Sequence, residues 1–287
     1  MSKNPTHTSI HLPLIMSKDF SLIMIRGPVG RRYHWYGFDK ALQHLLDISH
    51  VQFIDMPPQP STWKEALHYK NTKASMSHHN INTSKPFHLL ATSLGALTAF
   101  HLLQSQHNMK DVSKQCQSLC LINPSHRQLS SLHQRFSPLA VIHLFCTHLL
   151  SRSCGEKTML KLAINRPSIR KSIKKQALTW QETKPWTYKA LISQLLFHHK
   201  HSRHLPSPKD LPPTLILSGA KDRLVSPKCS LALAEYLHAP HMIHPAAGHD
   251  LTTEDPQWCL HHLKVFYDPF LKNLTNTPHK NIPLSSS

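Results

Sequence analysis

Short apolar runs recur along this chain of 287 residues, and helical patterns separate them. The runs are 22–25, 51–54, 87–90, 119–122, 214–217 and 241–243, and the helical patterns are 39–47, 94–104, 228–237 and 257–267. A strand buried on both faces of a sheet is apolar throughout, as several of these runs are. The alternation therefore predicts an α/β fold, with a mostly parallel sheet flanked by helices.

The alternation stops after Asn123-Pro124 and resumes at Leu211. The segment between, 126–210, is helical in pattern and carries 15 Lys and Arg against three acids, a net +12 of the chain's formal +18. We expect it to be a basic helical lid inserted into a core whose N-terminal part is 1–125 and whose C-terminal part is 211–270. The polar end of the chain, 271–287, is expected to be a flexible tail.

Ser93 lies in Ala-Thr-Ser-Leu-Gly, after an apolar run and before an Ala- and Leu-rich helical pattern. The pentapeptide is a variant of the G-x-S-x-G nucleophile elbow, a sharp turn that lifts the serine hydroxyl clear of a sheet. The small residues Ala91 and Gly95 allow the close backbone approach that this turn needs. A lone motif of this kind also fits a surface or capping serine, but its place between strand and helix favours a nucleophile. The backbone N–H of Leu94 would then be an oxyanion donor, helped by the helix dipole.

A serine hydroxyl needs a base, and the base needs an orienting acid. Asp222 follows the run LILSGAK, and His249 lies in Ala-Gly-His-Asp after the last apolar run. About one strand–helix–strand unit separates the two, so parallel pairing would bring both to the same edge of the sheet. The alternative for Asp222 is a turn or capping residue. Asp250, Glu254 and Asp255 are interpreted as loop and cap residues.

Together with IRGPVGRRYHWYGF, FIDMP and CLINPS, these motifs resemble the α/β-hydrolase superfamily over about residues 21–266. Within it the chain is most similar to small bacterial single-domain serine hydrolases of unknown substrate. The order serine, acid, histidine is the one this superfamily uses. The resemblance implies an α/β-hydrolase fold with Ser93 as nucleophile, His249 as general base and Asp222 as its orienting carboxylate. The implied reaction is cleavage of a carboxylic ester or thioester through an acyl-enzyme, with peptidase and lactonase variants left open.

The loop that begins at Gly27 should supply the second oxyanion N–H, by the same resemblance. The residue after this glycine is Pro28, which has no N–H. Either Val29 takes over or the hole has one donor fewer, and losing one donor costs about 10²–10³ in rate in a well-studied protease. The alternative function is therefore a catalytically weakened hydrolase-fold protein that binds an acidic partner, such as an acyl carrier protein, anionic lipid or RNA.

Arg26, Arg31, Arg32 and Trp35 cluster in the sequence beside the predicted pocket. They could form a substrate mouth, because arginine forks suit carboxylate or phosphate. Alternatively the arginines are solvated, and Trp35 is expected to pack beneath the loop.

The positive charge suits acidic partners, and the basic insertion is either a solvated helix face or a surface for an acidic protein or anionic membrane. No zinc finger, RNP motif or phosphate-binding glycine loop predicts specific nucleic-acid binding. The cysteines lack zinc-ligand spacing, so no metal site is expected. No cofactor is expected either, because the implied serine-hydrolase reaction needs none. No apolar run approaches the roughly 20 residues of a membrane span, and no secretory signal is recognised, so a cytoplasmic location is expected. The implied hydrolase reaction predicts a small acyl compound as the substrate.

Overall fold

The computed structural model describes residues 18–27, 32–54, 85–104, 114–183, 186–201 and 204–275. Pro28, Val29 and Arg31, on which the predictions for the oxyanion loop and the substrate mouth depend, lie outside these ranges. So does residue 276 and everything after it in the predicted tail.

Six strands form one parallel sheet in the order β2-β1-β3-β4-β5-β6. Their bounds are β1 (Lys18–Ile25), β2 (Ile48–Ile54), β3 (Phe87–Thr92), β4 (Cys116–Ile122), β5 (Thr214–Gly219) and β6 (His241–His244). Each of the six apolar runs in the sequence forms one of these strands. The predicted α/β class, a parallel sheet flanked by helices, is confirmed.

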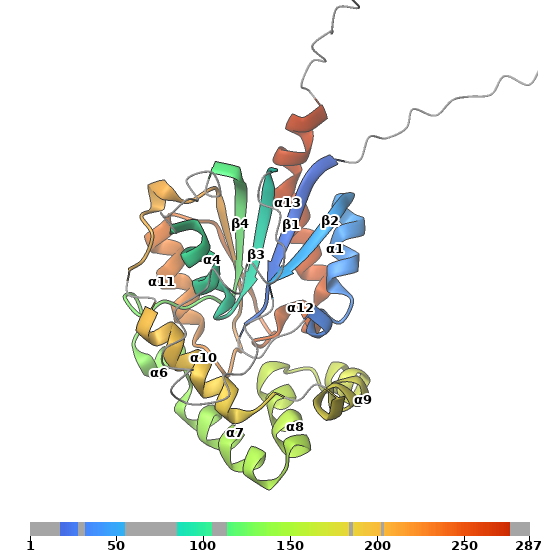
Figure 1. Ribbon diagram of the computed structural model, residues 1–287, viewed down its shortest axis with the longest axis vertical. Helices are drawn as coiled ribbons and strands as arrows, with labels where there is room; N and C mark the ends of the chain where they lie inside the picture. Colours follow the sequence, from blue (N-terminus) through green and yellow to red (C-terminus); the bar gives the residue numbers. More distant parts are fainter. Residues whose placement is uncertain are drawn as a thin grey trace, which may run out of the picture.

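Helices cover both faces of this sheet (Figure 1). One face holds α4 (Gly95–Gln104) and α11 (Pro227–Leu237), and the other holds α1 (Phe38–Leu46) and α13 (Pro256–Thr275). Successive side chains of a strand point to opposite faces, and β1 divides accordingly. Ile23 and Ile25 pack in the α4 and α11 layer, whereas Leu22 and Met24 pack in the α1 and α13 layer. Both layers are buried, which explains why the strands are continuously apolar.

The segment between β4 and β5 is helical, as its apolar stripes predict. It contains α6 (Leu132–Arg135), α7 (Pro138–Leu150), α8 (Arg152–Ala163), α9 (Pro167–Thr183), α10 (Tyr188–His201) and the 3₁₀ helix η2 (Pro208–Asp210). In Figure 1, α7, α8, α9 and α10 gather beyond one end of the sheet. A small apolar cluster holds α7, α8 and α10 together; it consists of Ala140, Leu144, Leu162, Trp186 and Leu191.

Two short helices complete the described chain, η1 (Arg32–Trp35) after β1 and α12 (Leu251–Glu254) before α13. Helix α13 continues to Thr275, past the start of the predicted tail at 271. Among the helices of the described ranges, none combines the length and the apolar character that a membrane crossing requires.

Candidate active site

Ser93 forms a strained turn between β3 and α4. Its φ is +54°, a left-handed value that is uncommon for residues other than glycine. The turn is held by the Ser93 N–H, which donates to the Ile122 carbonyl at 2.7 Å, and by the Ser93 carbonyl, which accepts from Ala96 N at 3.0 Å. This geometry is the one a nucleophile elbow requires.

Two glycines permit the close packing around this turn. A Cβ on Gly95 would lie 2.8 Å from the Arg26 carbonyl oxygen and 2.9 Å from that of Ile25, so α4 begins directly against the end of β1. A Cβ on Gly27 would lie 2.9 Å from Ser93 Cβ. The Gly27 N–H donates to Thr92 Oγ1 at 3.2 Å and is therefore engaged within the fold.

Asp222 and His249 meet at the ends of β5 and β6. His249 Nδ1 lies 2.6 Å from Asp222 Oδ2. The other carboxylate oxygen, Oδ1, accepts from the backbone N–H groups of Leu224 at 2.8 Å and Val225 at 2.9 Å. The Asp222 side chain is 1% exposed and the His249 side chain 14% exposed. The carboxylate is thus fixed from both sides, and it in turn orients the imidazole.

Ser93, Leu94 and His249 line one cavity of about 170 Å³. No hydrogen bond joins Ser93 to His249 in the structure, and such bonds are often long before substrate binds. Most of the remaining lining is apolar and comes from the inserted helices and the loop after Asp222; it includes Val141, Leu144, Met159, Leu160, Leu191, Leu195, Leu224 and Val225. The cavity is therefore polar where Ser93 and His249 line it, at the ends of the strands, and mainly apolar where the inserted helices line it.

Charge controls the protonation of His249. Burial acts to lower its pKa, but the charge and hydrogen bond of Asp222 and the charge of Asp250 act to raise it. Arg26 opposes them, and the net result is a pKa above the ordinary 6.5. The surroundings therefore stabilise the imidazolium that a general base forms when it takes a proton.

The residues of the predicted substrate mouth fall in different places. Arg26 lines the cavity, but its fork binds Asp250 in a bidentate pair, with both contacts at 3.2 Å. The guanidinium also lies 5.0 Å from the ring centre of Trp35, which is 1% exposed and packs in the core beneath it. The backbone of Arg32 belongs to η1. Asp250, interpreted from the sequence as a loop or cap residue, stands at the N-cap position of α12 and is in addition the ionic partner of Arg26.

Asn123 is a residue whose role the sequence analysis missed. It directly follows β4 with a φ of +50° and is buried. Its side-chain Nδ2 donates to the His249 carbonyl at 2.6 Å, while its Oδ1 accepts from Gly219 N at 2.9 Å. It thus ties the end of β5 to the loop that carries the histidine. The motif CLINPS contains this residue, but its contacts, about a hundred residues away, leave no local signal.

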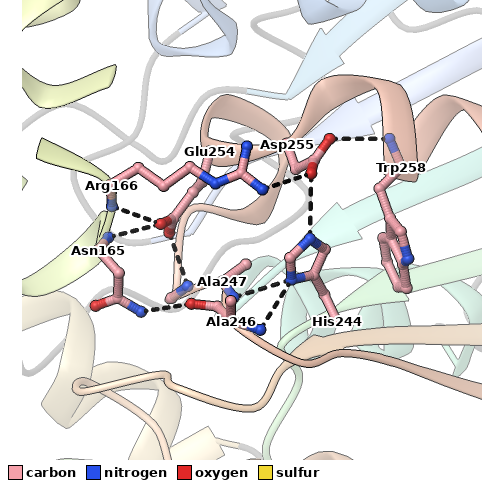
Figure 2. A network of polar contacts seen from close by, with 9 residues as sticks. Asn165, Arg166, His244, Ala246, Ala247, Glu254, Asp255 and Trp258 are labelled. Atoms are coloured by element: carbon pink, nitrogen blue, oxygen red, sulfur yellow. Dashed lines mark hydrogen bonds and ion pairs between the residues drawn. The ribbon is translucent and has the colours of Figure 1, made fainter. Parts of the chain in front are cut away.

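Glu254 connects the insertion to the same loop (Figure 2). Its Oε1 accepts from the backbone N–H groups of Asn165 at 2.9 Å and Arg166 at 2.7 Å, between α8 and α9. Its Oε2 accepts from Gly248 N, the residue before His249, at 2.7 Å. Glu254 is 1% exposed, so the fold contains a buried carboxylate that aligns three backbone donors. Its interpretation as a loop or cap residue was incomplete.

Asp255 extends the network on its outer side, as Figure 2 shows. One oxygen caps α13 by accepting from Trp258 N at 3.1 Å, which agrees with the interpretation of Asp255 as a cap residue. The other oxygen binds Arg166 at 2.9 Å and His244 Nε2 at 3.2 Å. The α8–α9 junction is thereby held against the end of β6 by two acids.

Within the parts of the chain that the structure describes, no cluster of three or more His, Cys, Asp or Glu is arranged to hold a metal ion. The polar residues that line the cavity include Ser93 and His249, and also Arg26, Arg135 and Glu156.

The chain belongs to the α/β-hydrolase family described as serine aminopeptidase, S33, whose family model matches residues 68–256. No curated protein matches the chain in sequence. The family assignment agrees with the resemblance that the sequence motifs indicate.

Solved structures of several enzymes share the fold. An esterase from Rhodococcus sp. ECU1013 is 13% identical with a TM-score of 0.62, over 87% of this chain and 90% of its own. An enol-lactonase from Burkholderia xenovorans LB400 is 13% identical with a TM-score of 0.58, over 86% and 91%. A thermophilic esterase from Thermogutta terrifontis is 17% identical with a TM-score of 0.56, over 89% and 90%. At such identities the likeness is one of fold.

Replacing Glu254 tests the connection between insertion and histidine loop. In Glu254→Gln one carboxylate oxygen becomes an NH₂ group that faces a backbone donor, so we expect the free energy of unfolding to fall by about 1–3 kcal/mol. Chemical denaturation measures it. The matched control, Glu182→Gln, changes an exposed glutamate of α9 and should stay within about 0.5 kcal/mol of the parent. Equal stabilities of the two variants would contradict the role given to Glu254.

Proposed function

We propose that this protein is a serine hydrolase that cleaves a carboxylic ester or thioester through an acyl-enzyme, with Ser93, His249 and Asp222 as its triad. The observation that carries the proposal is the 2.6 Å contact between His249 Nδ1 and Asp222 Oδ2, on an imidazole that lines the same cavity as Ser93. The left-handed turn at Ser93 supports the same role.

In this mechanism Ser93 Oγ attacks the acyl carbon while His249 Nε2 takes its proton. Asp222 keeps the Nδ1–H tautomer and stabilises the imidazolium. The Leu94 N–H, at the start of α4, donates to the oxyanion, and Val29 is proposed as the second donor. His249 then returns the proton to the leaving group, and a water, activated by the same imidazole, releases the acid and free Ser93.

The inserted helices α6 to α10 serve as the lid in this proposal. Support comes from their contribution to the cavity, which is mainly aliphatic. An apolar chamber next to the nucleophile suits the hydrocarbon part of an ester, whose burial contributes about 0.8 kcal/mol per methylene. Several solved structures of this fold are esterases, which supports ester cleavage over peptide cleavage as the reaction of this protein.

Removing the Ser93 hydroxyl tests the nucleophile. We expect Ser93→Ala to lower kcat for p-nitrophenyl hexanoate by at least about 10³-fold, because the residues of such a triad act as a unit. Purified protein and initial-rate kinetics measure it. Ser172→Ala, which changes an exposed serine of α9, is the matched control and should keep the parent activity. Comparable rates in Ser93→Ala and the parent would remove Ser93 from the mechanism.

The protonation of His249 sets the pH dependence. Because the base must be neutral and its pKa lies above 6.5, kcat/KM should fall as pH drops through a midpoint above that value. Asp250→Asn removes a charge that raises this pKa and releases Arg26, which lowers it, so the acid limb should move to lower pH. Asp210→Asn, at an exposed position in η2, should leave the limb in place. If the midpoint of the acid limb stays at the parent pH or moves to higher pH in Asp250→Asn, Asp250 does not raise the pKa of His249 in the way proposed here.

A further inference from the structure

Arg135 is a buried arginine in the wall of the cavity that contains Ser93. It is the last residue of α6, is 1% exposed and lines the cavity. Its Nε and Nη2 are buried without a hydrogen-bond partner in the described parts of the chain. A buried guanidinium has five N–H donors that need hydrogen-bond acceptors, and those on Nε and Nη2 lack one among the described residues.

Among the residues that the structure describes, no carboxylate is paired with Arg135. Within the described ranges it forms no ion pair, whereas Arg26, the other arginine in the cavity wall, is paired with Asp250. Burial lowers the pKa of Arg135, the charge of Arg127 lowers it further, and Cys229 opposes them. The Phe136 ring, 5.1 Å from the guanidinium carbon, supplies a cation–π contact. The positive charge of Arg135 is therefore not balanced by an acid among the described residues, and a bound anion would stabilise it.

Glu156 is the acid that also lines this cavity from the insertion, and it is engaged elsewhere. Its Oε2 accepts from Trp186 Nε1 at 2.6 Å, and burial raises its pKa although this hydrogen bond opposes the rise. It forms no ion pair with Arg135 within the described residues. An anion can therefore bind Arg135 without displacing a partner from any described residue.

We propose that Arg135 binds a carboxylate of the substrate, so that the preferred substrates are esters carrying a free carboxylate beside an apolar chain. The inference rests on the proposed function and narrows its substrate class. The guanidinium would form charge-assisted hydrogen bonds to the carboxylate in a site shielded from water, and the aliphatic wall would contact the chain between carboxylate and ester. Neutral esters of the same length leave the buried cation unpaired and are poorer substrates.

The test compares matched esters. In the first arm p-nitrophenyl hydrogen adipate is set against p-nitrophenyl hexanoate, with the succinate to suberate hemiesters used to vary the reach. In the second arm the carboxylate is on the leaving group, with 3-carboxy-4-nitrophenyl hexanoate set against the same neutral ester. We expect kcat/KM to favour the carboxylate by at least about tenfold in one arm, which identifies the half of the substrate that Arg135 binds.

The preference should be lost in Arg135→Met, while hydrolysis of the neutral hexanoate persists. Adipate should raise the Tm of the parent and leave that of Arg135→Met unchanged. If Arg135→Met does not fold, Arg135→Lys is measured in the same way. Lysine cannot form the two parallel hydrogen bonds of a guanidinium to a carboxylate, so the preference for the carboxylate ester should be smaller. No carboxylate preference in either arm, or an equal preference in the variant, overturns the proposal. Hydrolysis of the neutral ester that depends on Ser93 would, in that event, leave the proposed function standing.

Discussion

Backbone hydrogen bonds between successive strand ends hold together the end of the sheet where the candidate active site lies. Ser93 N, just past β3, donates to Ile122 O, the last carbonyl of β4, and Asn123 N, just past β4, donates to Leu217 O in β5. Ala220 N, just past β5, donates to His244 O at the end of β6. The parallel ladder thus continues for one residue beyond each strand. These bonds hold the left-handed conformations at Ser93 and Asn123, each of which costs about 1–3 kcal/mol.

Several acidic residues also lie near the C-terminal ends of the strands, although the chain has few acids. The chain carries 15 Asp and Glu against 33 Lys and Arg. Around the histidine loop, Asp222 contacts the imidazole, Asp250 binds Arg26, and Glu254 accepts from three backbone donors. Asp222 and Asp250 both act to raise the pKa of His249, Asp222 also orients the imidazole, and Glu254 connects the inserted helices to the loop before His249. Of the two arginines in the cavity wall, Arg26 is paired with an acid, whereas Arg135 has no acid partner among the described residues. For that reason we propose that Arg135 binds the substrate.

Periodicity and motif order were sufficient to predict the strands, the helical insertion and the meeting of Asp222 with His249. Burial on both faces makes the strand runs apolar, and parallel pairing fixes which loops come together. The Arg26–Asp250 pair joins residues 224 positions apart, and no local pattern encodes such a contact. The same holds for Glu254, whose donors are backbone groups and leave no trace in side-chain identity. In the sequence Arg135 is one basic residue among many, because only the structure shows that its buried Nε and Nη2 have no hydrogen-bond partner among the described residues.

The most direct test of the central claim is a crystal structure of the protein after reaction with a fluorophosphonate. We expect phosphorus bonded to Ser93 Oγ, a phosphonyl oxygen facing the Leu94 N–H, and His249 Nδ1 still bound to Asp222. Phosphorus on a different side chain, or an imidazole turned away from Asp222 in the adduct, would contradict the central claim.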